Sequence, residues 1–444
     1  MREKSDRIFY NVDWVTVIIY LLLVTMGWFN IYSAVYDEAK SNIFNLDRQE
    51  SKQLVFVGVS VILAFSILLI DASFFTATAP IIYGAIILLN IAVVFLGTSI
   101  KGSHSWFRFG SFGLQPGEFA KWATLLMLAK FLSGISKPDR LKTFLLSVGI
   151  ILLPMAIMIL LQNETGVALV FAGFVIVLYR EGIIPGWILL MGIFSAVAFV
   201  VGIKYPAMHV EKGGDNALHY SVDLFALGYW VGTLLLLAGI RFLFIQRTLK
   251  QLLFSSGVVV YLTAIFLAGP VILNKLPEHQ SGRIKSWLGL PVSREMSDRF
   301  DYNTRQSMIA IGSGGWTGKG YLQGTQTKFR FVPEQETDFI FCTVGEEWGL
   351  LGTSAVVILY LVLIMRLIIL SERQRSDFTR IYGYGVAAVF FIHLIVNVGM
   401  TIGLLPVIGI PLPFFSYGGS SLISFTILLF IFIRLDSQRL LVLR

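Results

Sequence analysis

Long runs of apolar residues, separated by short polar stretches, make up most of this chain. A run of ~20 mostly apolar residues can cross a bilayer as a helix. Twelve runs of this kind lie at 14–35, 53–71, 75–97, 118–134, 143–161, 165–180, 184–203, 222–245, 252–273, 338–366, 381–404 and 418–434. The pattern predicts an all-α polytopic membrane protein with twelve transmembrane helices. The weakest segment is 118–134, because it opens with Glu118 and Lys121.

Basic residues fall on alternate connections between these runs and so indicate an orientation. Lys and Arg are enriched on the cytoplasmic side of membrane proteins. With the N-terminus inside, each cytoplasmic connection that has room is basic, apart from the short turn at 72–74. Both termini are therefore predicted to be cytoplasmic. The segments predicted to lie outside are 99–117, 162–166, 204–220, 274–337 and 405–419.

The composition agrees with a membrane protein. The 444 residues are 56 % apolar and only 14 % charged, against about 25 % charged in soluble domains. Mean hydropathy is +0.76. The net charge of +8 then reflects basic cytoplasmic loops, and no nucleic-acid partner is expected. The first apolar run lacks a cleavage site and is expected to be retained. We expect one integral membrane domain over 1–444.

The segment 274–337 is too long for a simple connector. Loops beyond about 12–15 residues without structure of their own are usually functional or disordered. This one carries Trp287, Trp316 and many glycines, so it is expected to fold back on the membrane surface. Its charged stretch, residues 291–307, contains the carboxylates Asp298 and Asp301.

Glu118 and Lys121 are the first candidates for chemistry. They are three residues apart and share one helix face, at the outer end of a predicted span. They could form an ion pair that anchors the helix end. Alternatively, Lys121 could face an anionic substrate while Glu118 orients it, with Arg108 as a second cation on the same face.

Polar residues in three other places have simpler explanations. Gln162 and Glu164 fit a solvated external turn. His393 and Asn397 fit interhelical hydrogen bonding. Glu346 and Glu347 are harder to explain, since they fall in or beside a predicted span.

Two further patterns do not match established motifs. The glycine-rich run 310–328, with Lys319, differs from the P-loop pattern, although a backbone nest for a lipid pyrophosphate remains open. The spacings of His209, His219 and His279 with Glu211 and Asp215 match no metal-site pattern, and these histidines are read as loop residues.

Several motifs together resemble one family. They are KGSHSWFRFGSFGLQPGEFAKWA (101–123), QNETGVALVF (162–171), HQSGR (279–283), YNTRQSMIAIGSGGWTGKG (302–320), GTQ (324–326), FVPEQETDFIFCTVGEEWGLLG (331–352) and LPVIGIPLPFFSYGGSS (405–421). The combination resembles the SEDS family (shape, elongation, division and sporulation), and its RodA-like members more than its FtsW-like members.

The resemblance implies a multi-pass protein of the bacterial cytoplasmic (inner) membrane. It would be an inverting peptidoglycan glycosyltransferase that polymerises lipid II into glycan strands on the outer face during cell elongation and shape maintenance. Expected partners are lipid II, undecaprenyl-pyrophosphate-linked glycan and a class B penicillin-binding protein, a transpeptidase. A lipid II flippase, an FtsW-like division polymerase and a non-catalytic scaffold remain alternatives.

The chain departs from the family in two places. The family commonly has ten spans, so 222–273 is predicted to be an inserted transmembrane hairpin beside a ten-helix core. Family members also carry an Asp-Pro before the Tyr-Asn of the large loop, and that Asp is the proposed catalytic residue. Here the matching position is Ser293 or falls near Asp298.

Sugar transfer from a lipid pyrophosphate needs a base for the acceptor hydroxyl and positive charge for the leaving group. We predict Asp298 as the base, with Asp301 in reserve. The predicted substrate-binding residues are Arg108, Gln115, Glu118, Lys121, Arg283, Gln306 and Lys319. A divalent cation, Mg or Mn, could assist, but the sequence shows no dedicated ligand set.

Overall fold

Helices make up most of the chain, which divides into two compact units. The computed structural model describes residues 11–36, 48–100, 102–110, 112–135, 139–212, 218–244, 249–291 and 294–439. One unit comprises Met1–Ile183 and Tyr302–Arg444, and the other comprises Ile184–Asp301.

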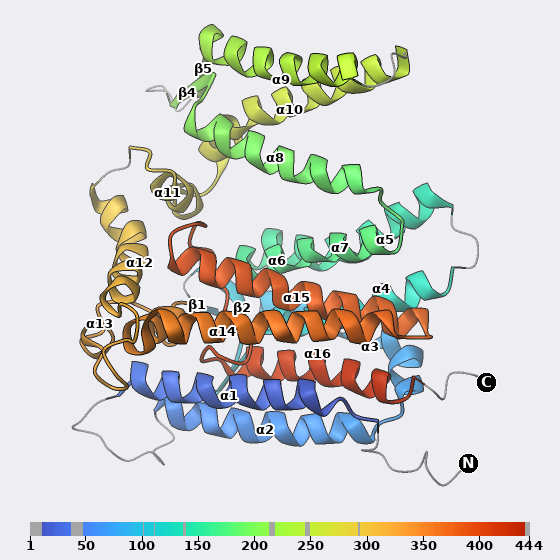
Figure 1. The fold of residues 1–444 in the computed structure, drawn as a ribbon, viewed down its shortest axis with the longest axis vertical. Coiled ribbons are helices and arrows are strands. Elements are labelled where there is room, and N and C mark those ends of the chain that lie inside the picture. The colour runs from blue at the N-terminus through green and yellow to red at the C-terminus, as the bar shows by residue number, and fades with distance from the viewer. Residues whose placement is uncertain are drawn as a thin grey trace. The chain divides into compact units, whose positions relative to one another are not determined.

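The first unit is a helical bundle whose long helices run side by side (Figure 1). Its N-terminal half contains α1 (Trp14–Ala34), α2 (Gln49–Leu69), α3 (Ala72–Leu96), α4 (Pro116–Ser133), α5 (Arg140–Ala156), the π-helical turn η1 (Ile157–Leu161), α6 (Thr165–Val170), the 3-10 turn η2 (Phe171–Gly173) and α7 (Phe174–Arg180). Its C-terminal half contains α13 (Thr325–Lys328), α14 (Ile340–Glu372), α15 (Asp377–Thr401) and α16 (Gly419–Ser437). The helix α12 (Arg294–Ser313) belongs to both units.

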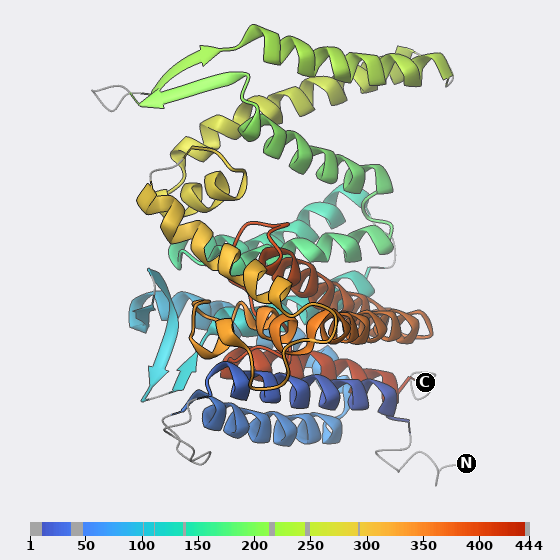
Figure 2. The ribbon, with the colours of Figure 1, turned by 60° about the vertical axis from the view of Figure 1, so that its left-hand side comes forward.

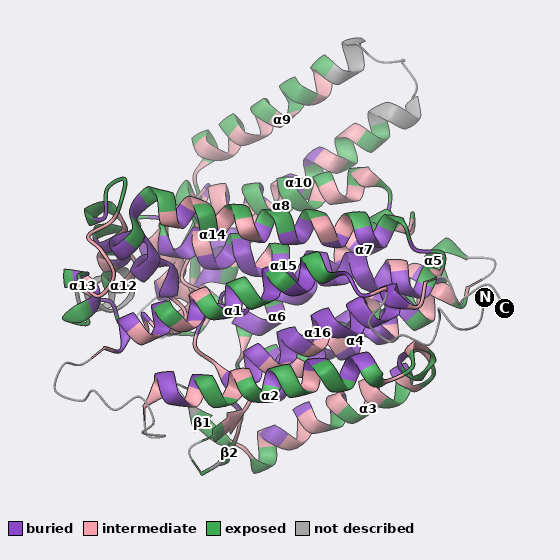
Figure 3. Cartoon of the chain, turned by 60° about the horizontal axis from the view of Figure 1, so that its bottom comes forward, coloured by how far each residue is buried: buried purple, intermediate pink, exposed green. Residues whose placement is uncertain are grey.

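The core of this unit is built around α15 and α16. Of the 18 most apolar consecutive residues in each helix, 78 % are buried in α15 and 83 % in α16. The corresponding shares are 28 % in α2 and 17 % in α3. The burial colouring shows the same contrast (Figure 3). The outer faces of α2 and α3 carry exposed apolar side chains such as Ile62 and Phe95, as lipid-facing helices do. The polar groups of α15 and α16 therefore lie inside protein.

All twelve predicted segments are helical in the structure. Among the described residues, nine helices are long and apolar enough to cross a membrane. Two shorter apolar helices, Thr165–Arg180 and Leu224–Ile240, match further predicted segments. The multi-pass helical class is confirmed. The count of twelve crossings and the orientation of the termini stay predictions.

A small antiparallel sheet follows α3. It consists of β1 (Thr98–Ile100), β2 (Ser103–Phe109) and β3 (Phe112–Leu114), in that order. The turn after η1 holds β2, because His104 N–H donates to the Gln162 carbonyl at 3.1 Å. The predicted external segment 99–117 is therefore ordered into strands that lead into α4.

The second unit contains α8 (Gly186–Lys204), β4 (Met208–Lys212), β5 (Leu218–Val222), α9 (Leu224–Phe244), α10 (Leu249–Lys275) and α11 (Glu278–Trp287). Figure 2 shows β4 and β5 as a ribbon that continues into α9. Glycines let α8 and α10 pack closely: a Cβ at Gly269 would lie 3.0 Å from the Phe199 carbonyl oxygen. The predicted hairpin 222–273 corresponds to α9 and α10, and its status as an insertion stays a prediction.

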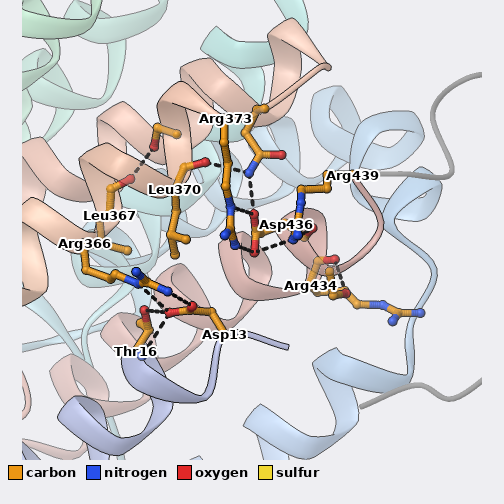
Figure 4. A network of polar contacts seen from close by, with 12 residues as sticks. Asp13, Thr16, Arg366, Leu367, Leu370, Arg373, Arg434, Asp436 and Arg439 are labelled. Carbon is orange, nitrogen blue, oxygen red and sulfur yellow. Dashed lines mark hydrogen bonds and ion pairs between the residues drawn. The ribbon is translucent and has the colours of Figure 1, made fainter. Parts of the chain in front are cut away.

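Charged side chains tie helix ends together at the end of the bundle where α14 and α16 finish (Figure 4). Arg366 pairs with Asp13, the residue that caps α1 through Thr16. Asp436, fully buried, accepts from Arg373 at 2.6 Å. Burial opposes ionisation of Asp13, but hydrogen bonds from Arg366 and Thr16 outweigh it and lower its pKa. Arg366 and Arg373 thus link helix ends.

Candidate active site

A buried lysine, Lys121, lies where α4 meets α15 and α16. Its ammonium nitrogen is 2.8 Å from Glu118 Oε2 and 3.1 Å from His393 Nε2. Lys121 is 1 % exposed and Glu118 is 2 % exposed. Buried charges are costly unless they are paired and hydrogen-bonded. The predicted pairing of Glu118 with Lys121 is confirmed, and the pair lies inside the protein.

Serines of α16 hold the first turn of α4 in place. Gln115 N–H donates to Ser420 Oγ at 3.1 Å, and Ser420 Oγ donates to the Gly113 carbonyl at 2.8 Å. Ser424 Oγ donates to the Glu118 carbonyl at 2.7 Å. The segment around Gln115 and Glu118 is therefore fixed by the start of α16, although the two helices are far apart in sequence.

The chain between α15 and α16 enters the bundle. We call residues 405–418 the buried loop, because Leu412, Phe414 and Phe415 within it are at most 2 % exposed. Side chains satisfy its carbonyls: His393 Nδ1 lies 2.9 Å from Pro411 O, and Asn397 Nδ2 donates to Ile410 O at 2.8 Å. Irregular backbone at membrane depth is tolerated where protein buries it.

The buried loop changes two sequence-based expectations. The segment 405–419 was expected to be a loop outside the membrane, whereas its centre packs in the core because its phenylalanines and leucine favour burial. His393 does bond another helix, through Lys121. Asn397 instead donates to the Asp338 and Ile410 carbonyls outside the helices.

Glu346, fully buried in α14, organises the glycine-rich segment. Its carboxylate accepts from Lys319 Nζ at 2.6 Å, from Thr327 N–H at 2.8 Å and Thr327 Oγ1 at 2.5 Å, and from Gln326 N–H at 2.8 Å. These donors include backbone amides at the start of α13, where a negative charge is favoured. Glu346 therefore anchors α13 to α14.

The glycine-rich segment also supplies hydrogen bonds on both sides of a break in α14. The break lies at Gly349, whose φ is 63° and ψ is −157°. Beyond the break, Leu350 N–H and Leu351 N–H donate to the carbonyls of Gly315 and Trp316, at 2.8 and 3.1 Å. Before it, the carbonyls of Glu346 and Glu347 accept from Lys319 N–H and Gly320 N–H, both at 3.0 Å. These two amides are thus engaged by the protein, so they do not form the open nest for a pyrophosphate.

Gly349→Ala is expected to destabilise the protein by about 1–3 kcal/mol, because this backbone region is essentially restricted to glycine. A Cβ there would also lie 2.7 Å from the Trp316 carbonyl carbon. Thermal unfolding in detergent measures the effect. The matched control is Gly312→Ala, in α12, whose Cβ would meet nothing within 4 Å. Equal melting temperatures for the two variants would contradict the prediction.

Two side chains make contacts to α1: Tyr321 of the glycine-rich segment and Glu347 of α14. The Tyr321 hydroxyl donates to the Phe29 carbonyl at 3.2 Å, and Ser33 donates to Glu347. Burial, with Glu347 and Tyr32 nearby, raises the pKa of Tyr321 to about 12. The phenol therefore stays protonated and keeps this bond.

The turn predicted to be solvated is partly buried. Gln162 is fully buried, and its Nε2 donates to the Asn90 carbonyl at 2.8 Å. Glu164 accepts from Ser103 Oγ at 2.9 Å. The solvated reading is wrong for Gln162, because α3 and β2 close over the turn.

The remaining predicted site residues lie on different elements of the fold. Arg108 is exposed on β2, whereas Lys121 is buried, so they do not form one accessible cationic face. Gln306 is half-buried on α12, and Lys319 is bound to Glu346. Arg283 lies on α11 in the second unit. The predicted acids Asp298 and Asp301 lie in α12, but their side chains fall outside the described residues.

Two residues of this site were not nominated from the sequence. His393 and Glu346 each meet partners from distant segments, and the only local signal was an ionisable residue inside an apolar run. Within the described part of the chain, no group of three or more His, Cys, Asp or Glu side chains could hold a metal ion. Assistance by a divalent cation stays a prediction.

One family model matches most of the chain. The family model for cell cycle proteins of the FtsW/RodA/SpoVE type matches residues 13–212 and 224–440. The match therefore includes both α9 and α10. It also includes Lys121 with its partners Glu118 and His393, and Glu346 with its partners Lys319, Gln326 and Thr327.

Two of the more similar relatives have the same activity in their descriptions. The chain is 32 % identical to peptidoglycan glycosyltransferase RodA of Treponema pallidum, over 93 % of this chain and 94 % of the relative. It is 31 % identical to peptidoglycan glycosyltransferase MrdB of Escherichia coli K12, over 88 % and 86 %. A lower similarity, 29 %, links it to stage V sporulation protein E of Bacillus subtilis, over 92 % and 93 %.

Solved structures share the fold. A chain from a peptidoglycan synthase complex that coordinates polymerization and crosslinking has a TM-score of 0.68, at 25 % identity over 97 % of this chain and 99 % of that chain. The rod shape determining protein RodA of Thermus thermophilus has a TM-score of 0.57, at 23 % identity over 97 % and 98 %. The resemblance to the SEDS family is confirmed, and the chain belongs to the FtsW/RodA/SpoVE family of cell cycle proteins.

Proposed function

We propose that this protein is a peptidoglycan glycosyltransferase that polymerises lipid II into glycan strands. The observation that carries the proposal is its similarity to the RodA and MrdB enzymes over most of both chains. The buried ion pair of Lys121 with Glu118 adds support, because it is a cation and a carboxylate among membrane-spanning helices. Such groups are expensive in a membrane and usually mark function.

The reaction joins an acceptor hydroxyl to the anomeric carbon of a lipid-pyrophosphate donor. A carboxylate takes the hydroxyl proton, the oxygen attacks the anomeric carbon, and the lipid pyrophosphate leaves with its bonding electrons. One displacement inverts an α-linked donor to a β-glycoside. We assign the base to Asp298, with Asp301 as the reserve.

Cations must stabilise the departing pyrophosphate. We assign Arg108, which is exposed, to this role. Lys121 has one ammonium donor left for it, because Glu118 and His393 engage the other two of its three. We assign Arg283 and Lys319 as further cations, and Gln115, Glu118 and Gln306 as orienting groups.

The protein would work in the bacterial cytoplasmic (inner) membrane, with the sugars on the outer face. A class B penicillin-binding protein, a transpeptidase, is the proposed partner. The structural similarity to a synthase complex that couples polymerization with crosslinking supports this pairing. We assign it a role in cell elongation over one in division, because it is more similar to RodA and MrdB, at 32 % and 31 % identity, than to an FtsW, at 27 %.

The test is polymerisation of labelled lipid II by the purified full-length protein in detergent, with and without the partner transpeptidase. We expect glycan strands that a muramidase digests. The control omits the membrane protein, so that polymer made by a contaminant is detected. Lipid movement across liposomes without polymer would identify a flippase instead. Absence of polymer even with the partner would favour a scaffold.

A further inference from the structure

His393 contacts both the buried loop and Lys121. It is fully buried in α15. Its Nδ1 lies 2.9 Å from the Pro411 carbonyl oxygen of the buried loop. Its Nε2 lies 3.1 Å from Lys121 Nζ on α4. One imidazole ring therefore bridges the buried loop and the buried cation.

The partners fix the protonation of this ring. A carbonyl oxygen can only accept, so Nδ1 must carry a hydrogen. A lysine ammonium has three donors and no acceptor, so Nε2 must present its lone pair. His393 is therefore the neutral tautomer with Nδ1 protonated, and Nε2 accepts from Lys121. The second nitrogen of a histidine commonly sets the role of the first in this way.

These contacts hold the ammonium in one place. Lys121 donates to Glu118 at 2.8 Å and to His393 at 3.1 Å. It also lies 4.2 Å from the centre of the Phe425 ring, a favourable cation–π distance. That ring packs edge-on against His393, with centroids 4.8 Å apart. The position of Lys121 thus depends on His393, and through it on the Pro411 carbonyl.

We propose that His393 is a positioning residue for Lys121, which sets the place of the ammonium by accepting its hydrogen bond at Nε2 while the buried loop holds Nδ1. The inference rests on the proposed function, in which Lys121 stabilises the departing pyrophosphate. The alternative is that His393 only anchors the buried loop through Nδ1. The two roles use different nitrogens, so two substitutions separate them.

His393→Gln and His393→Asn form the matched pair. A Gln amide reaches about as far as Nε2, so its oxygen can accept from Lys121. The Pro411 carbonyl then loses its donor. An Asn amide reaches about as far as Nδ1, so its nitrogen can donate to the Pro411 carbonyl. Lys121 then loses its acceptor on α15. Positioning predicts that His393→Asn lowers kcat/KM for lipid II by about 100-fold, the effect of a small misplacement of a reacting group. His393→Gln should stay within about tenfold of wild type.

The opposite order would overturn the proposal. If His393→Asn is the more active variant, loop anchoring is the role of the ring. Equal losses overturn it as well, because then the Nε2 contact has no separate effect. Melting temperatures are measured alongside, and positioning predicts that activity follows the Lys121 contact and not the melting temperature.

A second readout needs neither activity nor a folded variant of His393. In wild-type protein with ¹⁵N-labelled histidine, the buried ring should show a protonated Nδ1 and an unprotonated Nε2. An imidazolium, or a proton on Nε2, would overturn the proposal. Since this spectrum does not involve lipid II, it can overturn the proposal even if the protein fails to polymerise, and the failure of the proposed function is then distinguishable.

Discussion

Asp298→Ala is expected to lower the rate of lipid II polymerisation by about 10²–10⁴-fold, the usual contribution of a general base. The residue lies in α12, just before the family-like stretch that begins at Tyr302. An unperturbed Asp, with a pKa of about 3.9, is a weak base, and partial burial would improve it. Initial rates with labelled lipid II, under conditions where wild type is linear, give the comparison.

Asp301→Ala and Asp298→Asn are the controls. If Asp298 is the base, Asp298→Asn should be as inactive as Asp298→Ala, since an amide keeps the size but cannot take a proton. Asp301→Ala should retain most of the activity. Reversed losses would transfer the role to Asp301. Full activity in both alanine variants would place the base elsewhere, while wild-type polymerisation would still support the proposed function.

The helical architecture was largely predictable because its signal is local. Each apolar run between polar stretches became a helix, since length and composition decide whether a segment can cross a bilayer. The pairing of Glu118 with Lys121 was predictable for the same reason, as residues three apart on a helix share a face. Local spacing could not show that this pair would be buried.

Burial and long-range contacts depend on tertiary packing, which the sequence pattern does not encode. Lys121 and His393 are 272 positions apart, and neither local segment indicates the other. The break at Gly349 was also hidden, because 338–366 reads as one predicted span in spite of Glu346 and Glu347. The glycines between 312 and 324 were a usable signal, since backbone that packs against a broken helix leaves little room for side chains.

Glu346→Ala is expected to destabilise the protein by about 3–5 kcal/mol, the range for removing one partner of a buried ion pair. Lys319 would lose its counterion, and the amides of Gln326 and Thr327 would lose their acceptor. Because Glu346 holds α13 against α14, we also expect protease cleavage within 314–330 and loss of polymerisation. Thermal unfolding and limited proteolysis in detergent measure these effects.

Lys319→Met provides the matched comparison, because it removes the same ion pair from its other side. In Lys319→Met the fully buried Glu346 loses a counterion that is itself 26 % exposed, and partly exposed ion pairs contribute little. The carboxylate would still accept from Gln326 and Thr327, and hydrogen bonds to a charged group contribute about 1.5–3 kcal/mol each. Lys319→Met should therefore destabilise clearly less than Glu346→Ala. If the two variants melt together, the ion pair alone holds the segment, and the amide contacts to Glu346 contribute nothing measurable.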